Sequence, residues 1–168
     1  MGLLVVGLLL GVMLGSGEVV ATAAKAAPLT LEKVTIPAAA FGPTDTGAGF
    51  TRIRNNGRYL YTTLPAEEVI AALQFRYPVV TIRKVTLYAY DNADQAVCLR
   101  LYRTDPELGT EDKMAEFCST GASETYPREF SETAISPRRV RMGNGLYVEV
   151  YLRSGDYGLT GVRIIYGH

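Results

Sequence analysis

The two cysteines of the chain have a spacing that predicts a disulfide bond. Cys98 and Cys118 flank the segment TDPELGTED at 104–112, in which Asp-Pro and a glycine are typical of a turn. When the flanks are folded antiparallel about Leu108, the two cysteines lie opposite each other, with Cα atoms about 4.5–5.5 Å apart, which a disulfide tolerates. The same register gives the pairs Leu99–Phe117, Leu101–Ala115 and Arg100–Glu116, which are favourable, and Arg103–Lys113, which is not. We predict a structural disulfide across a hairpin; free thiols or a redox pair are the alternatives, and no C-x-x-C spacing is present.

Residues for catalysis are much scarcer. His168 is the only histidine, which excludes Ser-His-Asp and Cys-His catalysis and most zinc sites. Paired carboxylates could in principle cleave glycosides. The candidates are Glu67, Glu68, Glu116 and Glu149. Since Glu116 already faces Arg100 in the predicted hairpin, we interpret these carboxylates as solvated surface groups. The prediction is a protein that is not an enzyme and holds no cofactor.

A loop of hard oxygen donors could bind calcium. The segment DNADQ at 91–95 offers Asp91, Asn92 and Asp94, but it lacks the length and the distal glutamate of an EF-hand. The same residues make an ordinary turn, because Asp and Asn side chains bond to their own backbone. We therefore predict no metal site, and calcium at this loop is the alternative.

Tyrosine is abundant, with eleven residues against no tryptophan. Five tyrosines fall on the outer phase of predicted strands and form a candidate aromatic contact face: Tyr88, Tyr90, Tyr102, Tyr147 and Tyr151. Such a row could stack on sugar rings, or be covered by a neighbouring subunit, since tyrosine is enriched at interfaces. It could also be covered by a loop of the same chain. The missing tryptophan counts against sugar binding.

Short strands must position these residues. The segment LYVEVYLR at 146–153 alternates apolar and polar residues, and similar patterns occur at 30–36, 57–64, 79–91 and 161–167, with turn signals between them. Only AEEVIAALQF at 66–75 has helical spacing, with Val69, Ile70 and Leu73 on one side. Seven to nine strands predict an all-β fold, an antiparallel two-sheet sandwich of jelly-roll or Greek-key type with one short helical crossover.

Charge and the N-terminal segment restrict the environment. The 168 residues carry 17 basic and 17 acidic side chains, and this balance disfavours nucleic acid as a partner. An apolar run at 3–14 is followed by small residues that fit the A-x-A pattern of signal peptidase, although no Lys or Arg precedes it. We predict a signal peptide at 1–26 and a secreted, extracellular or cell-surface protein that has no membrane contact after cleavage. A retained N-terminal anchor is the alternative.

Five segments resemble a pattern in a family of uncharacterised secreted proteins of environmental bacteria. They are VTIPAAAFGPTD, YLYTT, VVTIRKVTLYAYDN, LRLYRTD and YGLTGVRIIY, and the resemblance covers most of residues 33–166. The chain departs from that family at FRYPVVTI, where the family has a Leu-Pro-x-Gly turn. The resemblance implies a jelly-roll-like β-sandwich, and it carries over no catalytic residue.

The domain organisation suggests two functions of different classes. We predict an N-terminal strand with a Gly-rich tether at 27–49 and a sandwich domain at 50–168. A strand on a tether could complete the sheet of a second copy, which would build a homopolymeric filament or surface layer. The candidate interface residues of that strand are Leu29, Leu31, Val34 and Ile36. The same strand could equally pair within its own chain. The alternative function is a secreted or cell-surface carbohydrate-binding module.

Overall fold

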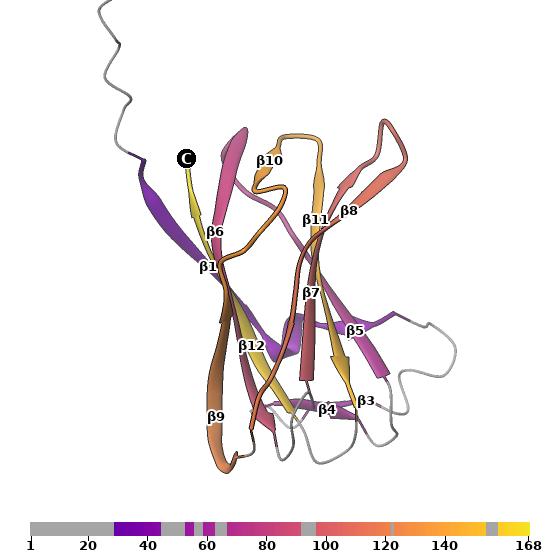
Figure 1. The fold of residues 1–168 in the computed structure, drawn as a ribbon. Helices are drawn as coiled ribbons and strands as arrows, with labels where there is room; N and C mark the ends of the chain where they lie inside the picture. Colours follow the sequence, from indigo (N-terminus) through magenta and orange to yellow (C-terminus); the bar gives the residue numbers. More distant parts are fainter. Residues whose placement is uncertain are drawn as a thin grey trace, which may run out of the picture.

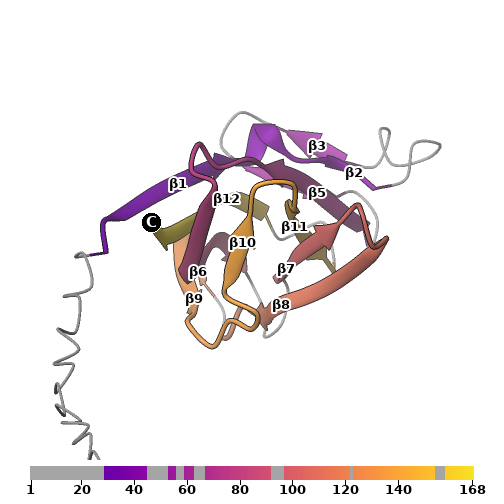
Figure 2. The same cartoon turned by 90° about the horizontal axis from the view of Figure 1, so that it is seen from above.

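The computed structural model describes residues 29–44, 53–55, 59–62, 67–91, 97–121, 123–153 and 158–168. The predicted signal peptide at 1–26 lies outside these residues. Figure 1 shows two sheets side by side, and Figure 2, which looks from above, shows their strands arranged around a common interior. None of the described residues belongs to a helix that is long and apolar enough to cross a membrane.

The described elements are almost all strands. They are β1 (Leu31–Pro37), the 3-10 turn η1 (Ala38–Ala40), β2 (Gly42–Pro43), β3 (Ile53–Asn55), β4 (Leu60–Thr62), β5 (Glu67–Leu73), β6 (Val79–Asp91), β7 (Val97–Asp105), β8 (Thr110–Cys118), β9 (Ser123–Glu132), β10 (Arg139–Arg141), β11 (Gly145–Leu152) and β12 (Gly158–Gly167). Sheet A is built around β6 and β12: β9 and β10 pair with β6, β1 and β4 pair with β12, and β3 pairs with β4. Sheet B has the order β2-β5-β11-β7-β8. The pairs are antiparallel, so the predicted two-sheet sandwich is confirmed.

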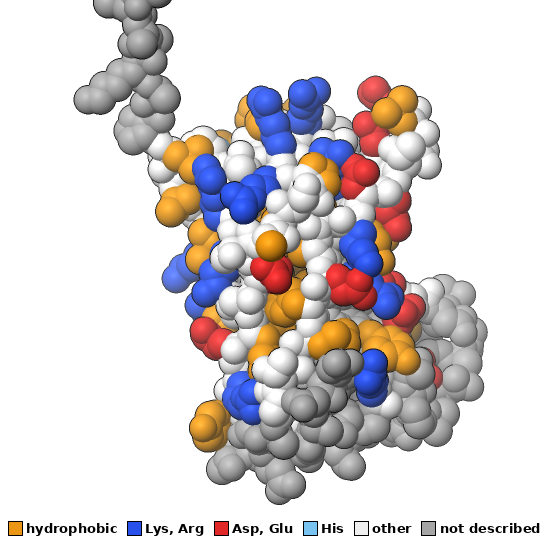
Figure 3. Space-filling model, in the orientation of Figure 1, with side chains coloured by type: hydrophobic (Ala, Val, Ile, Leu, Met, Phe, Trp, Pro, Cys, Tyr) orange, Lys and Arg blue, Asp and Glu red, His pale blue; other side chains and the backbone are white. Residues whose placement is uncertain are grey.

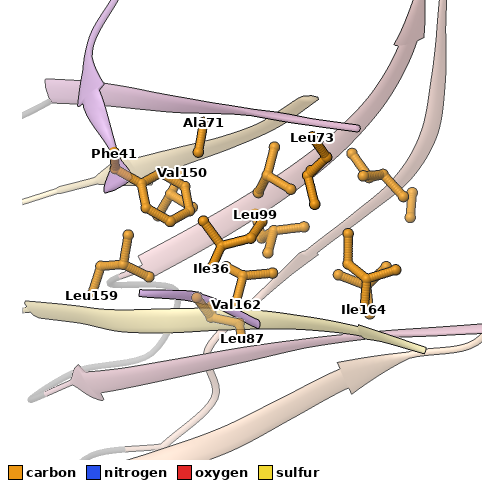
Figure 4. Close-up of a cluster of buried hydrophobic side chains, with 14 of the residues drawn as sticks. Ile36, Phe41, Ala71, Leu73, Leu87, Leu99, Val150, Leu159, Val162 and Ile164 are labelled. Atoms are coloured by element: carbon orange, nitrogen blue, oxygen red, sulfur yellow. The ribbon is translucent and has the colours of Figure 1, made fainter. Parts of the chain in front are cut away.

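The core fills the space between the sheets. On β11 the predicted alternation is confirmed, because Leu146, Val148, Val150 and Leu152 are buried while Tyr147, Glu149 and Tyr151 are half-buried on the other side. Side chains of sheet A meet them from β6 and β12, and Figure 4 shows Leu87, Val162 and Ile164 facing Leu99 and Val150. Period-2 burial in both sheets leaves the alternate residues of each strand on the two outer faces.

The β7–β8 hairpin confirms the predicted register around the cysteines. Cys98 pairs with Cys118, and a disulfide joins them. The pairs Leu99–Phe117, Arg100–Glu116 and Leu101–Ala115 are all present.

Nearer the turn, the predicted register is wrong. A register shift follows Leu101, so that Tyr102 faces Lys113 and Arg103 faces Asp112. Arg103 forms an ion pair with Asp112 there. An antiparallel ladder without the shift would oppose two cations, Arg103 and Lys113. The extra residue on β8 replaces this repulsion with an attraction.

The predicted helical crossover at 66–75 is also wrong, because residues 67–73 form the strand β5. β5 pairs with β11 from Glu67 opposite Leu152 to Leu73 opposite Leu146. Val69, Ala71 and Leu73 are buried at a period of two, which the helical spacing of Val69, Ile70 and Leu73 had concealed. Pairing with β11 therefore overrides the helix propensity of the two alanines and two glutamates.

The N-terminal strand takes the second of the two arrangements that the sequence allowed. β1 pairs with β12 of its own chain over seven residues, from Leu31 opposite Gly167 to Pro37 opposite Gly161. The predicted tether begins with η1 and β2, and β2 pairs with β5 in sheet B. Phe41, between them, is buried in the core. The structure therefore gives no support to donation of this strand to a second copy.

Candidate functional site

Three tyrosines lie together on the outer face of sheet B, because they alternate with the buried residues of β7 and β11. Tyr147 pairs with Tyr102 on one side and Ala72 on the other, and Tyr151 pairs with Cys98 and Glu68 in the same way. Between these two rows, Glu149 lies opposite Arg100 and Ile70. We call this surface the tyrosine face and define it by Arg100, Tyr102, Tyr147, Glu149 and Tyr151.

Two rings of the tyrosine face stack on each other. The ring centroids of Tyr102 and Tyr147 are 5.0 Å apart, with an angle of 18° between the planes. On the other flank of Tyr147, the directly opposed residue is Ala72, which is exposed. Because alanine carries only a methyl group, no long side chain lies directly opposite Tyr147 on this flank.

Charged groups surround the stacked rings. Arg100 donates from Nε to Glu116 Oε1 at 2.9 Å and from Nη1 to Glu149 Oε2 at 3.3 Å, and its Nη1 lies 3.5 Å from Glu68 Oε1. The pKa of Arg100 is raised by its hydrogen bonds to Glu116 and Glu149. The pKa of Glu116 is lowered by its bonds to Lys113 and Arg100. These carboxylates keep free lone pairs, so they can also accept hydrogen bonds from ligand hydroxyl groups.

The phenol groups of Tyr102 and Tyr147 stay protonated at neutral pH, because the pKa of each is raised. Burial and a hydrogen bond to Glu111 raise the pKa of Tyr147, and burial raises the pKa of Tyr102. Tyr147 donates its hydroxyl proton to Glu111 Oε2, which fixes the orientation of the ring. This arrangement is suited to holding a ligand. The lowered pKa of Glu116 keeps this carboxyl ionised at neutral pH, so it has no proton to donate as a general acid.

The other two candidate tyrosines lie on the opposite side of the molecule. Tyr88 and Tyr90 belong to β6 in sheet A, whereas the tyrosine face belongs to sheet B. The Arg163 guanidinium lies over the Tyr88 ring, 5.0 Å from its centroid. The Tyr90 ring packs against Tyr59 at 5.2 Å and 60°. The five candidate tyrosines therefore form two separate groups, one on each sheet.

The candidate interface residues in and just before β1 differ in burial. Leu29 and Leu31 are 44% and 61% exposed, whereas Val34 packs against the core and Ile36 is part of it. Between them, Glu32 accepts hydrogen bonds from the hydroxyls of Tyr77 at 2.7 Å and Tyr166 at 2.8 Å.

One of the three residues of the alternative calcium site can be placed. Asp91 is fully buried at the end of β6, 3.9 Å from Arg128 Nη1. Asn92 and Asp94 lie outside the described residues. Within the described ranges, no three His, Cys, Asp or Glu side chains come together in a way that could hold a metal ion.

The sequence reasoning missed some of the site residues. Ala72 was missed because its strand was interpreted as a helix, and period-2 burial of Val69, Ala71 and Leu73 was the signal that could have found it. Glu68 and Glu149 were noted only as surface carboxylates. Their shared contact with Arg100 depends on three adjacent strands, which a single segment cannot reveal.

Comparison of this geometry with solved structures identifies modules of the same architecture. The chain is similar to the C-terminal CBM6 of LamC, a marine laminarinase from Zobellia galactanivorans, with a TM-score of 0.50 and 11% identity over 79% of this chain and 98% of that chain. It is similar to the xylan-binding module CBM15, with a TM-score of 0.51 and 9% identity over 82% and 97% of the two chains. A third match is the CBM22-1 and GH10 modules of a Clostridium thermocellum xylanase, with a TM-score of 0.50 and 13% identity over 79% of this chain and 27% of that chain.

These similarities concern the fold. TM-scores of 0.50–0.51 show that the chain shares the β-sandwich of these modules, and identities of 9–13% limit the comparison to the fold. No protein-family model matches the sequence, and no curated protein matches it.

Proposed function

We propose that this protein is a carbohydrate-binding module, and that the tyrosine face of sheet B binds a sugar chain. The observation that carries the proposal is the Tyr102–Tyr147 stack next to the exposed Ala72. A sugar ring has a flat face of C–H groups, which packs well against an aromatic ring. Tyrosine provides a large apolar surface together with a polar tip, which suits a ligand that is itself both apolar and polar.

The charged groups complement this apolar contact. Arg100 can donate to a sugar oxygen, and the carboxylates of Glu68, Glu116 and Glu149 can accept from sugar hydroxyls. The side chains of these four residues are between 16% and 38% exposed, so solvent and ligand can reach them. Their mutual ion pairs hold the donors and acceptors in place before a ligand arrives, which reduces the entropy lost on binding.

The other function suggested by the sequence, a structural subunit of a filament or surface layer, has less support. Its main argument was the donated strand, and β1 has its pairing partner, β12, in its own chain. The similar folds are also carbohydrate-binding modules rather than filament subunits. We therefore prefer the binding module.

Binding to neutral polysaccharides tests the proposal. Xylan and laminarin are reasonable first ligands, since the similar structures include a xylan-binding module and a module of a laminarinase. We expect depletion of the protein by an insoluble polysaccharide, or heat of binding with a soluble oligosaccharide. Tyr147→Ala should weaken binding at least about tenfold, the equivalent of about 1.4 kcal/mol. Ala72→Leu should weaken it similarly, because the larger side chain fills the space beside the ring.

Two further variants serve as controls. Tyr147→Phe retains the ring, so it should retain most of the affinity. Tyr126 is 62% exposed on β9, in the other sheet, so Tyr126→Ala removes an exposed tyrosine without touching the face. The proposal fails if no polysaccharide binds, or if Tyr126→Ala and Tyr147→Ala have the same effect.

A further inference from the structure

The outer face of sheet A has a hollow that the proposed sugar site does not use. Its volume is about 370 Å³, and its walls include Thr35, Tyr88, Glu129, Thr160 and Arg163. These residues come from β1, β6, β9 and β12, so the hollow lies across the middle of the sheet. Its size falls within the range of small-molecule sites, about 300–1,000 Å³. We call it the sheet A hollow.

Arg163 is the principal charged group of this hollow. Register places it between Thr35 on β1 and Thr86 on β6, and its guanidinium lies over the Tyr88 ring. Its Nε is buried and has no hydrogen-bond partner among the described residues. The guanidinium is planar, and its terminal N–H groups form a fork that can bind a carboxylate through two hydrogen bonds.

Two lysines continue the positive charge along the sheet. Lys33 on β1 and Lys84 on β6 both lie opposite Ile165 of β12, in the outer row next to that of Arg163. Within the described part of the chain, no carboxylate lies in ion-pair contact with Lys33, Lys84 or Arg163. Figure 3 shows Lys and Arg side chains gathered over β1 and β6. Because these cations have no ion-pair partner among the described residues, they are available to an external anion.

The two outer faces differ in charge. The three outer rows of sheet A around the hollow contain three cationic side chains, Lys33, Lys84 and Arg163, and one carboxylate, Glu129. The outer rows of sheet B contain two cationic side chains, Arg100 and Lys113, and four carboxylates, Glu68, Glu111, Glu116 and Glu149. An anionic ligand is therefore attracted to sheet A and repelled from the tyrosine face.

We propose that the sheet A hollow is a second binding site, which takes an anionic sugar unit of a polysaccharide. Arg163 binds its carboxylate or sulfate group, and Lys33 and Lys84 attract the neighbouring anionic units of the same chain. The hydroxyl of Thr35 and the carboxylate of Glu129 bond to sugar hydroxyls. A carboxylate inside the hollow disfavours a multiply charged anion such as phosphate, whereas it suits a ligand that carries hydroxyl groups beside one negative charge.

Binding of the full-length chain to immobilised polymers tests this site. Biolayer interferometry would compare polygalacturonate, dextran sulfate and neutral dextran at neutral pH. We expect binding to at least one anionic polymer and none to dextran, and the binding should weaken as salt screens the charges. Binding to polygalacturonate alone would assign a uronate, binding to dextran sulfate alone would assign a sulfated sugar, and binding to both would assign the negative charge itself.

Matched variants separate this site from simple charge attraction. Arg163→Gln should weaken binding at least about fivefold, whereas Arg153→Gln, which removes the same charge from an exposed residue after β11, should change it less than about twofold. The double variant Lys33→Gln/Lys84→Gln should also weaken binding. If Arg163→Gln does not fold, this double variant tests the site in its place. Absence of binding to both anionic polymers, or equal effects of Arg163→Gln and Arg153→Gln, would overturn the proposal.

Discussion

Glu32 holds several distant parts of the chain together with one side chain. Its carboxylate accepts hydrogen bonds from Tyr77 and Tyr166, which are 45 and 134 residues away, and it forms an ion pair with Arg76. His168 stacks on the Tyr77 ring at a centroid distance of 3.5 Å. The hydrogen bonds from Tyr77 and Tyr166, with the charge of Arg76, lower the pKa of Glu32 from 4.5 to about 2.

This lowered pKa predicts how stability depends on pH. The folded state holds the carboxylate more strongly than the unfolded state does, so the contribution is complete above pH 4.5 and is lost as pH falls toward 2. We expect Glu32→Gln to be less stable than the natural chain at pH 5–7, and the difference to shrink progressively between pH 4.5 and 2. Urea titrations of both proteins across this range measure it. A difference that grows on acidification would contradict the assignment.

At the residue scale, the sequence predicted only contacts between residues that lie near each other along the chain. The pairing of Cys98 with Cys118 followed from their symmetry about a turn, because both positions lie on one hairpin. The contacts of Glu32 and of Arg163 could not be predicted in this way. Their partners lie on strands far apart in the sequence, and only the sheet order brings them together.

At the scale of an element, only part of the register of the β7–β8 hairpin could be predicted from the sequence. The register next to the cysteines was predictable because several favourable pairs agreed on it. The shift after Leu101 was not, because a bulge leaves no pattern in the alternation of β7. The unfavourable Arg103–Lys113 pair was the one sign that the ladder must change. β5 was mispredicted for a similar reason, since its strand character comes from pairing with β11.

The disulfide of this hairpin contributes measurably to the free energy of unfolding. The two cysteines are separated by 20 residues, and closing a loop of this size stabilises a fold by about 3 kcal/mol in the chain-entropy description. We expect Cys98→Ala/Cys118→Ala to lose about that much free energy of unfolding in urea titrations. Reductant should destabilise the natural chain and leave the double variant unchanged. Alkylation of two thiols in the unreduced natural chain would disprove the disulfide.

At the scale of the whole molecule, the sandwich separates the two outer faces from each other. Alternation along β11 and β6 buries one side of each strand in the shared core and leaves the tyrosine face and the sheet A hollow on opposite sides. The all-β class and the two-sheet arrangement were predictable from alternation and turn spacing. The division of the five tyrosines between the two sheets was not, because outer-phase residues look alike in sequence whichever sheet their strand joins.

The position of β1 bears directly on whether this strand is donated to a second copy of the chain. β1 completes sheet A on the edge of β12, with Ile36 in the core and Glu32 bonded to Tyr166. A strand held in its own chain is protected from hydrogen exchange by an intramolecular equilibrium, which does not depend on protein concentration. A donated strand is protected only when a second copy is bound, so its protection rises with concentration.

Hydrogen exchange of the full-length chain at different concentrations separates these cases. We expect the backbone amides of residues 31–37 to exchange at the same rate at ~1 and ~100 μM, because mass action has no effect on a contact within one chain. Glu32→Gln, which removes the ionic contact to Arg76 and weakens the bonds from Tyr77 and Tyr166, should accelerate exchange in β1 equally at both concentrations. The amides of β7, in the other sheet, provide the internal reference in each experiment. If protection of β1 instead increases with concentration, the strand is exchanged between copies, and the preference for a binding module over an assembling subunit would have to be reversed.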